Sequence, residues 1–227
     1  MGQVAHFFLE GKEWKEQVLQ RGLNGILPIQ IRVLAAQKVS FDFHAQKSAV
    51  QKQYSYYFQQ GPCALPHLEP YSWWIHKKLD LQAMAEGLKF LEGEHDFKPF
   101  QSSGAKPGPT VRKIFETEVS FQRIGFPHDR PFFNLEQQDL ATPIGLVRVR
   151  IKGSGFLKQM VRGIAGTLLQ VGEARKPATL FREILETSDR GRVGPTAPAR
   201  ALWLETVWYP ESFELWKPKM TGKDPNG

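Results

Sequence analysis

The sequence predicts an α/β (α+β) protein with a mainly antiparallel sheet and helices on one of its faces. Residues 115–121 and 147–152 alternate apolar with polar side chains, as half-buried strands do. Residues 80–93 and 154–172 instead space their apolar side chains along one face of a helix, between a capping residue and a glycine. The order of these strands and helices along 227 residues motivates the fold class.

Composition narrows the class of protein and its compartment. With 30 Lys and Arg against 23 Asp and Glu, the net charge of +7 favours a polyanionic partner without identifying one. The single cysteine, Cys63, excludes an internal disulfide framework and a cysteine-based zinc site, which is typical of the reducing cytoplasm. No apolar run is long enough to span a bilayer, and the first residues lack the features of a signal peptide. We therefore expect a soluble cytoplasmic protein that contacts no membrane.

The first seventy residues predict a strand, a helix and two further strands. Residues 2–8 are typical of a short strand. Residues 12–21 carry apolar side chains at helical spacing, and residues 29–33 then alternate apolar with polar side chains as a strand does. Residues 52–58 are rich in aromatic side chains and predict a strand that offers aromatic and basic groups to one surface. The prolines and glycine of 61–70 indicate a loop.

The middle of the chain predicts a helix followed by two irregular segments. Asp80 is placed to cap the helix over 80–93, and the apolar stripe of that helix is typical of a core. Residues 101–109 are either a plain connector or a loop that faces nucleic acid. Residues 125–143 form a long irregular excursion, for which a binding finger and a disordered tip are both consistent with the sequence.

The strand over 147–152 carries a row of basic side chains. Arg148, Arg150 and Lys152 point to one side of it, about 6.6 to 6.8 Å apart, which is comparable to the phosphate spacing of an extended nucleic acid. RNA contact is one interpretation of this row. Ion pairing across the sheet with Glu116 and Glu118 is the other.

The last third of the chain predicts two helices and a strand. In the helix over 154–172, Ser154 is placed to cap the first turn, and Lys158 and Arg162 lie four apart on the face away from the core. An anion could approach that face, although a solvated basic face has the same pattern. The chain continues with a helix at 179–186, a strand at 201–208 and a polar tail at 211–227.

The segment FLKQMVRGIAGTLLQVG resembles, nearly position for position, the corresponding helix of the TruA-type tRNA pseudouridine synthases. Four further stretches resemble the same family in the same order, and together they cover most of residues 1–210: GLNGILP at 22–28, FDFHAQKSAVQKQYSYYF at 41–58, GEHDFKPF at 93–100 and TAPARALWL at 196–204. The chain is identified as a member of this family on these five stretches.

The resemblance implies a fold, an activity and partners. The expected fold is that of the pseudouridine synthases, with an incomplete N-terminal RNA-binding half at 1–41, a synthase half at 42–210 and a polar tail at 211–227. The expected activity is isomerisation of uridine to pseudouridine in the anticodon stem-loop of tRNA, at positions 38–40 in this family. The implied partners are tRNA and a second copy of the chain, and the family's chemistry uses no metal and no cofactor.

The resemblance also assigns site residues. Tyr54 aligns with the tyrosine that packs against the target uracil once that base has left the helical stack, and Arg162 aligns with the basic partner of the catalytic aspartate. Without the resemblance, a core tyrosine and a solvated arginine are the simpler interpretations. The expected RNA contacts are basic residues: His44, Lys52, Arg112, Arg148, Arg150 and Lys158. Gln46 stands where the family commonly has an arginine.

One element of the family's chemistry has no counterpart in these residues. Its nucleophilic aspartate lies in a GRTDAGVH-like motif shortly before the strand that GQVAHF resembles, and no segment of the 227 residues resembles that motif. Asp96 is an aspartate after a helix-ending glycine, which is typical of a turn former. We therefore expect either an enzyme whose given sequence lacks its N-terminal segment, or an inactive truncated relative that binds tRNA or acts as its chaperone.

Overall fold

The computed structural model describes residues 2–11, 14–124, 143–213 and 215. The chain divides into two compact units. The sheet unit comprises residues 1–3 and 51–207, and the small unit comprises residues 4–50 together with the chain from 208 onward. The functional division expected at residues 41 and 210 stays a prediction, and most of the excursion at 125–143 lies outside the described residues.

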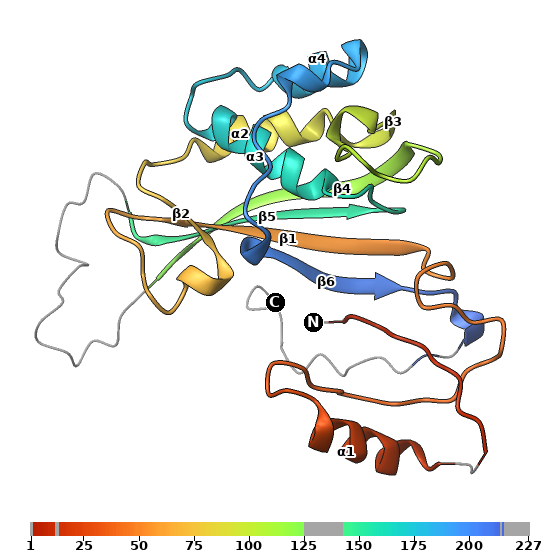
Figure 1. Ribbon diagram of the computed structural model, residues 1–227. Helices are drawn as coiled ribbons and strands as arrows, with labels where there is room; N and C mark the ends of the chain where they lie inside the picture. The colour runs from red at the N-terminus through yellow and green to blue at the C-terminus, as the bar shows by residue number, and fades with distance from the viewer. Residues whose placement is uncertain (1, 12–13, 125–142, 214, 216–227) are drawn as a thin grey trace, which may run out of the picture. The chain divides into compact units, whose positions relative to one another are not determined.

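A six-stranded sheet forms the centre of the sheet unit (Figure 1). Its strands follow the order β2-β1-β5-β4-β3, and β6 also pairs with β1. The β1–β5, β5–β4 and β4–β3 pairs are antiparallel, whereas β1 and β2 are parallel. The predicted, mainly antiparallel sheet is therefore confirmed, with these bounds: β1 Gln51–Gln60, β2 Trp73–Ile75, β3 Gly93–Asp96, β4 Val111–Arg123, β5 Gly145–Gly153 and β6 Leu202–Trp208.

Three helices cover one face of this sheet, as the sequence predicts. Figure 1 shows α2 (Leu81–Lys89), α3 (Met160–Gly172) and α4 (Leu180–Thr187) on the same side of the strands, which we call the helix face. The core lies between the two layers and is built from fully buried side chains of both: Tyr56 and Phe58 of β1, Val149 of β5, Met84 and Leu88 of α2, Ile164 and Leu168 of α3, and Phe181 of α4. None of the helices in the described ranges is long and apolar enough to cross a membrane.

Alternation along β5 separates the core from the other side of the sheet, which we call the opposite face. Val147, Val149 and Ile151 are at most 1% exposed beneath the helices. The intervening Arg148 and Arg150 keep about a third of their side chains exposed, at 33% and 30%. Because side chains alternate between faces along a strand, both arginines lie on the opposite face.

The cap of α2 is confirmed, whereas the start of α3 differs from the prediction. Asp80 Oδ1 accepts a hydrogen bond of 2.9 Å from the backbone N–H of Ala83. Ser154 caps no helix, because its N–H donates to Lys113 O at 2.8 Å and its Oγ accepts from Lys113 N at 3.1 Å, which continues the sheet. The helix begins only at Met160, after a turn over residues 154–159 that we call the β5–α3 turn.

Segment 193–196 packs closely against the middle of α3. A Cβ built on Gly166 would lie 1.7 Å from the backbone oxygen of Pro195, so the helix approaches this segment without room for a side chain. The backbone N–H of Gly194 donates to Thr167 Oγ1 at 2.9 Å, and that hydroxyl donates to Gly163 O at 2.9 Å. Close contact and paired polar groups therefore fix segment 193–196 on the helix.

The small unit departs most from the predictions. Its helix, α1 (Glu16–Ile26), begins and ends later than the predicted 12–21. Residues 29–33 form no strand. Ile31 N donates to Pro28 O at 2.9 Å in a turn, and Val33 is bonded by the Asn24 side chain, whose Oδ1 accepts from Val33 N at 2.8 Å and whose Nδ2 donates to Val33 O at 2.9 Å. Residues 2–8 also form no strand. Gly2 N donates a hydrogen bond of 3.1 Å to Glu205 O of β6, but this segment does not continue as a strand.

Candidate active site

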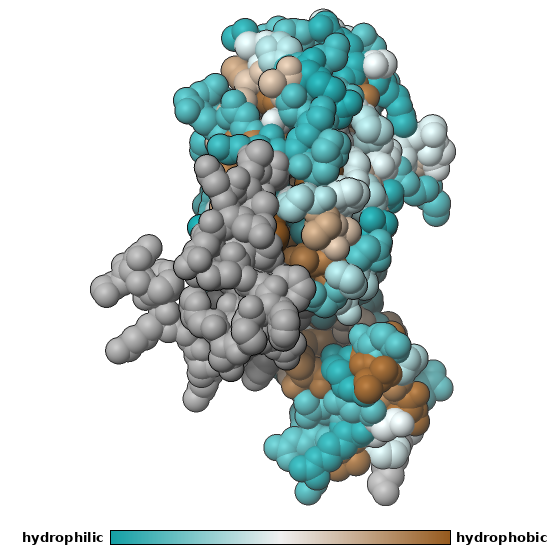
Figure 2. Space-filling model, turned by 90° about the vertical axis from the view of Figure 1, so that its left-hand side faces the viewer, coloured by the Kyte–Doolittle hydropathy of each residue, from teal (hydrophilic) through white to brown (hydrophobic). Residues whose placement is uncertain are grey.

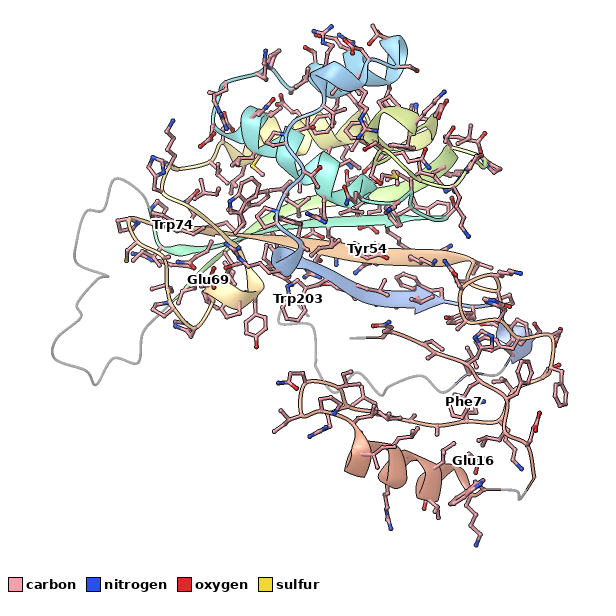
Figure 3. All side chains as sticks on the ribbon, in the orientation of Figure 1. Phe7, Glu16, Tyr54, Glu69, Trp74 and Trp203 are labelled. Carbon is pink, nitrogen blue, oxygen red and sulfur yellow. The ribbon has the colours of Figure 1, made fainter. Side chains whose placement is uncertain are left out.

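Tyr54 lies on β1 on the helix face, where its ring contacts the β5–α3 turn. It is in register with Ile151 of β5, and its ring meets the ring of Phe156 edge-on at a centroid distance of 5.0 Å. Burial raises the pKa of the Tyr54 hydroxyl above its ordinary value, so the group stays neutral at physiological pH. The side chain remains partly exposed, and Figure 3 shows its position along β1. Tyr54 is thus held by packing without being fully buried.

Arg162 belongs to the first turn of α3 and is fixed by the backbone of Ala197. Its Nε donates to Ala197 O at 2.6 Å, and Ala197 N donates to Arg162 O at 3.2 Å. The next residue is held from the sheet, because the Tyr56 hydroxyl donates to Pro198 O at 3.0 Å. Burial raises the pKa of Tyr56, although the charges of Arg162 and Arg200 act against this shift. No carboxylate among the described residues pairs with the guanidinium of Arg162.

Three of the predicted RNA contacts gather at the β5–α3 turn together with Tyr54. Lys52 is in register with Gly153, directly before the turn. Arg112 of β4 lies against the turn, since a Cβ built on Gly155 would be 3.5 Å from its Nε. Lys158 is part of the turn, is exposed, and accepts a hydrogen bond at its backbone oxygen from Ser102 N at 3.0 Å. The turn therefore collects an aromatic ring and three cations.

Arg148 and Arg150 lie away from this group, on the opposite face of the sheet. The Nη2 of Arg148 donates to both carboxylate oxygens of Glu205, at 2.8 and 2.6 Å, and its Nε donates to Ser55 Oγ at 3.0 Å. Arg150 forms ion pairs with Glu118 and, at 3.8 Å, with Glu116. Pairing with Glu116 and Glu118, the alternative considered for this basic row, is thus observed for Arg150, whereas Arg148 pairs with Glu205 instead. RNA contact by the two arginines stays a prediction.

His44 belongs to the small unit. Its ring lies 4.4 Å from that of His6, and its Nδ1 accepts hydrogen bonds from the N–H groups of Gln46 and Lys47, both at 3.2 Å. The histidine therefore stabilises the turn that follows it. Contact of His44 with RNA remains a prediction.

The structure adds residues that sequence reasoning did not assign. Tyr56 and Ala197 hold Arg162 in place, and Glu205 neutralises Arg148. Alternation along β1 places Tyr56 on the same face as Tyr54, which is a signal for a shared role. For the stretch TAPAR, the sequence offers only the family resemblance. Any residue type carries a backbone oxygen, so the sequence does not reveal that Ala197 O orients Arg162.

A small pocket lies close to these residues in the described part of the chain. It has a volume of about 80 Å³ and lies at the start of α3, lined by Phe100, Ser102, Gln159, Arg190 and Thr196 among others. Pockets for small molecules typically measure roughly 300 to 1,000 Å³. A partly exposed ring beside three cations fits an extended polyanion better than an enclosed small molecule.

Removing the Glu205 carboxylate is expected to destabilise the sheet unit and to change its acid sensitivity. Burial acts to raise the pKa of Glu205, but hydrogen bonds from Gln53 and Ser55 and the charge of Arg148 outweigh it, so the pKa lies below the usual 4.5. A lowered carboxylate pKa contributes stability above pH 4.5 that is lost as the pH falls through the folded-state pKa.

We expect Glu205→Gln to cost about 1 to 3 kcal/mol at pH 7, because it leaves Arg148 without its counter-charge. The difference from the unaltered chain should shrink as the pH falls below 4.5, and urea unfolding at pH 7 and at pH 4 measures both. Glu211→Gln, an exposed change outside the network, is the control. A Glu205→Gln chain as stable as the unaltered one at pH 7 would contradict this role.

Comparison with known proteins adds independent evidence. Residues 88–210 match the family described as tRNA pseudouridine synthase. The tRNA pseudouridine synthase A of Chloroflexus aurantiacus is 35% identical over 215 residues, which cover 95% of this chain and 71% of the relative. The enzyme of the same name from Bdellovibrio bacteriovorus is 33% identical over 219 residues, 94% of this chain and 75% of the relative. The enzyme of the same name from Thermus thermophilus is 36% identical over 190 residues, which cover 83% of this chain and 67% of the relative. The chain therefore belongs to the TruA-type tRNA pseudouridine synthases.

Proposed function

We propose that this chain is a tRNA pseudouridine synthase, an isomerase that acts on uridine in the anticodon stem-loop. The observation that carries the proposal is the meeting of Tyr54 with Lys52, Arg112 and Lys158 at the β5–α3 turn, beside the helix that carries Arg162. Cations beside an exposed aromatic ring bind a phosphate backbone and stack an unpaired base at the same time. The relatives named tRNA pseudouridine synthase A support tRNA as the substrate.

The two central residues have separate tasks in the proposed reaction. The ring of Tyr54 stacks on the uracil after the base has left the helical stack, which is worth roughly 1 to 3 kcal/mol per base. The guanidinium of Arg162, oriented through Ala197, pairs with the nucleophilic carboxylate and keeps it ionised. That carboxylate forms a covalent adduct while the uracil is detached, turned and rejoined through carbon. In this family it comes from the GRTDAGVH-like segment.

Reversing two charges at the β5–α3 turn tests RNA binding. We expect Arg112→Glu with Lys158→Glu to weaken tRNA binding at low salt by at least about tenfold, because phosphate contacts are lost and like charges approach. The measurement is a titration of labelled tRNA followed by fluorescence anisotropy. Arg175→Glu with Lys176→Glu makes the same change in net charge in the exposed segment after α3, and should leave affinity nearly unchanged. Equal losses for both double variants would reduce the effect to net charge and refute the site.

An RNA-binding protein or tRNA chaperone without catalysis is the second candidate. It is favoured by one observation, that Arg162 has no carboxylate partner among the described residues. Both candidates bind tRNA through the same surface, and only the first predicts that the chain converts uridine once a GRTDAGVH-like segment precedes it. The activity measurement described in the Discussion separates them.

We further propose that the protein is cytoplasmic and that it forms a homodimer. The homodimer is supported by exposed apolar side chains in the small unit. Figure 2 shows brown, hydrophobic side chains among those of the small unit. No residue of α1 is buried. Large apolar side chains that are at least 48% exposed recur along residues 7–41: Phe7, Phe8, Leu9, Trp14, Val18, Ile26, Ile29, Ile31, Leu34 and Phe41. Patches of this kind mark surfaces that bind other proteins.

We expect light scattering at micromolar concentration to give the mass of two chains. Ile26→Lys with Ile29→Lys, which places charge at side chains that are 80% and 77% exposed, should shift the mass toward one chain. Val111→Lys, at an exposed apolar residue of the sheet unit, is the control. A monomeric mass for the unaltered chain would contradict the dimer.

A further inference from the structure

Segment 69–78 carries exposed aromatic and basic side chains at the far end of β1 from Tyr54. Tyr71 is 54% exposed and Trp74 is 38% exposed, although both are large rings of the kind that proteins usually cover. His76, Lys77 and Lys78 follow them and are also exposed. We call these five residues the aromatic surface; the chemistry proposed above uses none of them.

The backbone of this segment is held rigidly, so the rings are displayed in fixed positions. Trp74 Nε1 donates to Gly61 O at 2.9 Å, and Trp203 Nε1 donates to Tyr71 O at 3.1 Å. Ser72 Oγ donates to Leu68 O at 2.7 Å. The polar edge of Trp74 therefore points to the protein, and part of the ring remains free for contact. A ring that is already ordered loses little conformational entropy when a ligand stacks on it.

Trp74 and a contact series of three aromatic side chains, Tyr57, Trp203 and Tyr71, lie on the opposite face of the sheet. Trp74 is in register with Gln59, which lies on the same face as Tyr57. The ring of Trp203 contacts Tyr57 edge-on at 6.3 Å and Tyr71 at 5.5 Å, so Tyr71 extends an aromatic cluster that begins on β1. Figure 3 labels Trp74 on β2 and Trp203 on β6.

The charges around these rings favour a polyanion. No carboxylate among the described residues pairs with Lys77 or Lys78. Glu69, the acidic residue of the segment, is paired with Arg200 at 3.3 Å. Exposed rings beside unpaired lysines are the combination that binds unpaired nucleotides, because each base has a π-face to stack and each nucleotide a phosphate. A protein partner would need a larger apolar area than two partly exposed rings.

We propose that the aromatic surface is a second RNA-binding site, at which Tyr71 and Trp74 stack on unpaired bases and Lys77 and Lys78 contact the adjacent phosphates. This rests on the proposed function, since the RNA is the tRNA substrate. Tyr54 and Gln59, the register partner of Trp74, are five residues apart on β1, or about 17 Å, and they face opposite sides of the sheet. The second site therefore binds unpaired nucleotides outside the anticodon stem-loop that Tyr54 receives.

Two RNA probes distinguish the sites: a complete tRNA transcript and the isolated anticodon stem-loop. Anisotropy titrations should show that Tyr71→Ala with Trp74→Ala weakens binding of the tRNA by about 30-fold or more, in line with the stacking lost at two rings. Binding of the stem-loop should change less than about twofold. Arg112→Glu with Lys158→Glu should instead weaken both RNAs.

Conservative variants separate stacking from folding. Tyr71→Phe keeps the ring and should retain full tRNA affinity, whereas Tyr71→Ala should not. Lys77→Gln with Lys78→Gln should lower the slope of log affinity against log salt by roughly one to two. Phe115→Ala, at a ring of β4 that is 39% exposed and belongs to neither proposed RNA site, is the matched control and should have no effect.

Each outcome decides the proposal. It is overturned if the alanine variants bind tRNA normally, if they lose tRNA and stem-loop equally, or if Tyr71→Phe fails as badly as Tyr71→Ala. It is also overturned if the alanine variants alter self-association without altering RNA affinity. In these cases the charge-reversal result at the β5–α3 turn still stands, whereas failure of the unaltered chain to bind either RNA overturns the proposed function as well.

Discussion

Incubated with unmodified tRNA, the 227-residue chain is expected to form no pseudouridine above background. Tyr54 can hold a flipped base and Arg162 can orient a carboxylate, but neither supplies the nucleophile. In the serine protease subtilisin, removal of the nucleophile lowers the rate on the order of 10⁶-fold, and we expect a loss that large to leave no measurable turnover here. The same chain joined behind a GRTDAGVH-like segment should convert uridine, and chemical mapping of pseudouridine in the tRNA measures both.

Variants assign the activity to named residues. In the extended protein, Arg162→Ala should lower turnover strongly, whereas Lys176→Ala should not. Asp96 should be dispensable, because its Oδ1 accepts from Lys98 N at 2.9 Å and hydrogen bonding from Thr110 lowers its pKa, both typical of a turn. If the 227-residue chain did turn over and Asp96→Asn abolished that turnover, Asp96 would be the nucleophile. Turnover that survives every Asp→Asn change would overturn the mechanism.

Gly166→Ala is expected to destabilise the sheet unit by about 3 kcal/mol or more. The added methyl would lie 1.7 Å from Pro195 O, and the opposing atom is backbone, so no side-chain rotation can relieve the overlap. Segment 193–196 must then move, and its hydrogen bond from Gly194 N to Thr167 Oγ1 is lost with it. For a chain of this size, we expect the melting temperature to fall by roughly 6 to 12 °C.

Gly163→Ala is the matched control on the same helix. A Cβ at Gly163 would lie 3.6 Å from Phe100 Cδ1, an ordinary contact, so alanine should be neutral or stabilise by up to about 1 kcal/mol through helix propensity. Thermal and urea unfolding followed by circular dichroism compare the two. If Gly166→Ala unfolded within about 1 kcal/mol of the unaltered chain, the close approach would not be needed for stability.

Local patterns predicted the sheet unit well where one side of an element is buried and the other is not. The alternation in β5 and the apolar stripe of α2 report burial directly, because each residue type follows its own environment. The same reasoning failed in the small unit. Residues 29–33 alternate as a strand does, but the backbone of Val33 finds its partner in the Asn24 side chain, and a pattern of apolar residues cannot reveal which group supplies the hydrogen bonds.

By itself, the sequence determined the fold class, the family and the residue types of the site, because these depend on local periodicity and on stretches of recognisable residues. Only the tertiary structure decided which of the cations share a surface. Lys52, Arg112 and Lys158 meet at the β5–α3 turn, whereas Arg148 and Arg150 are paired with glutamates on the opposite face. The physical reason is that strand register and the late start of α3 bring distant residues together, and both are set by hydrogen bonds between segments far apart in the chain.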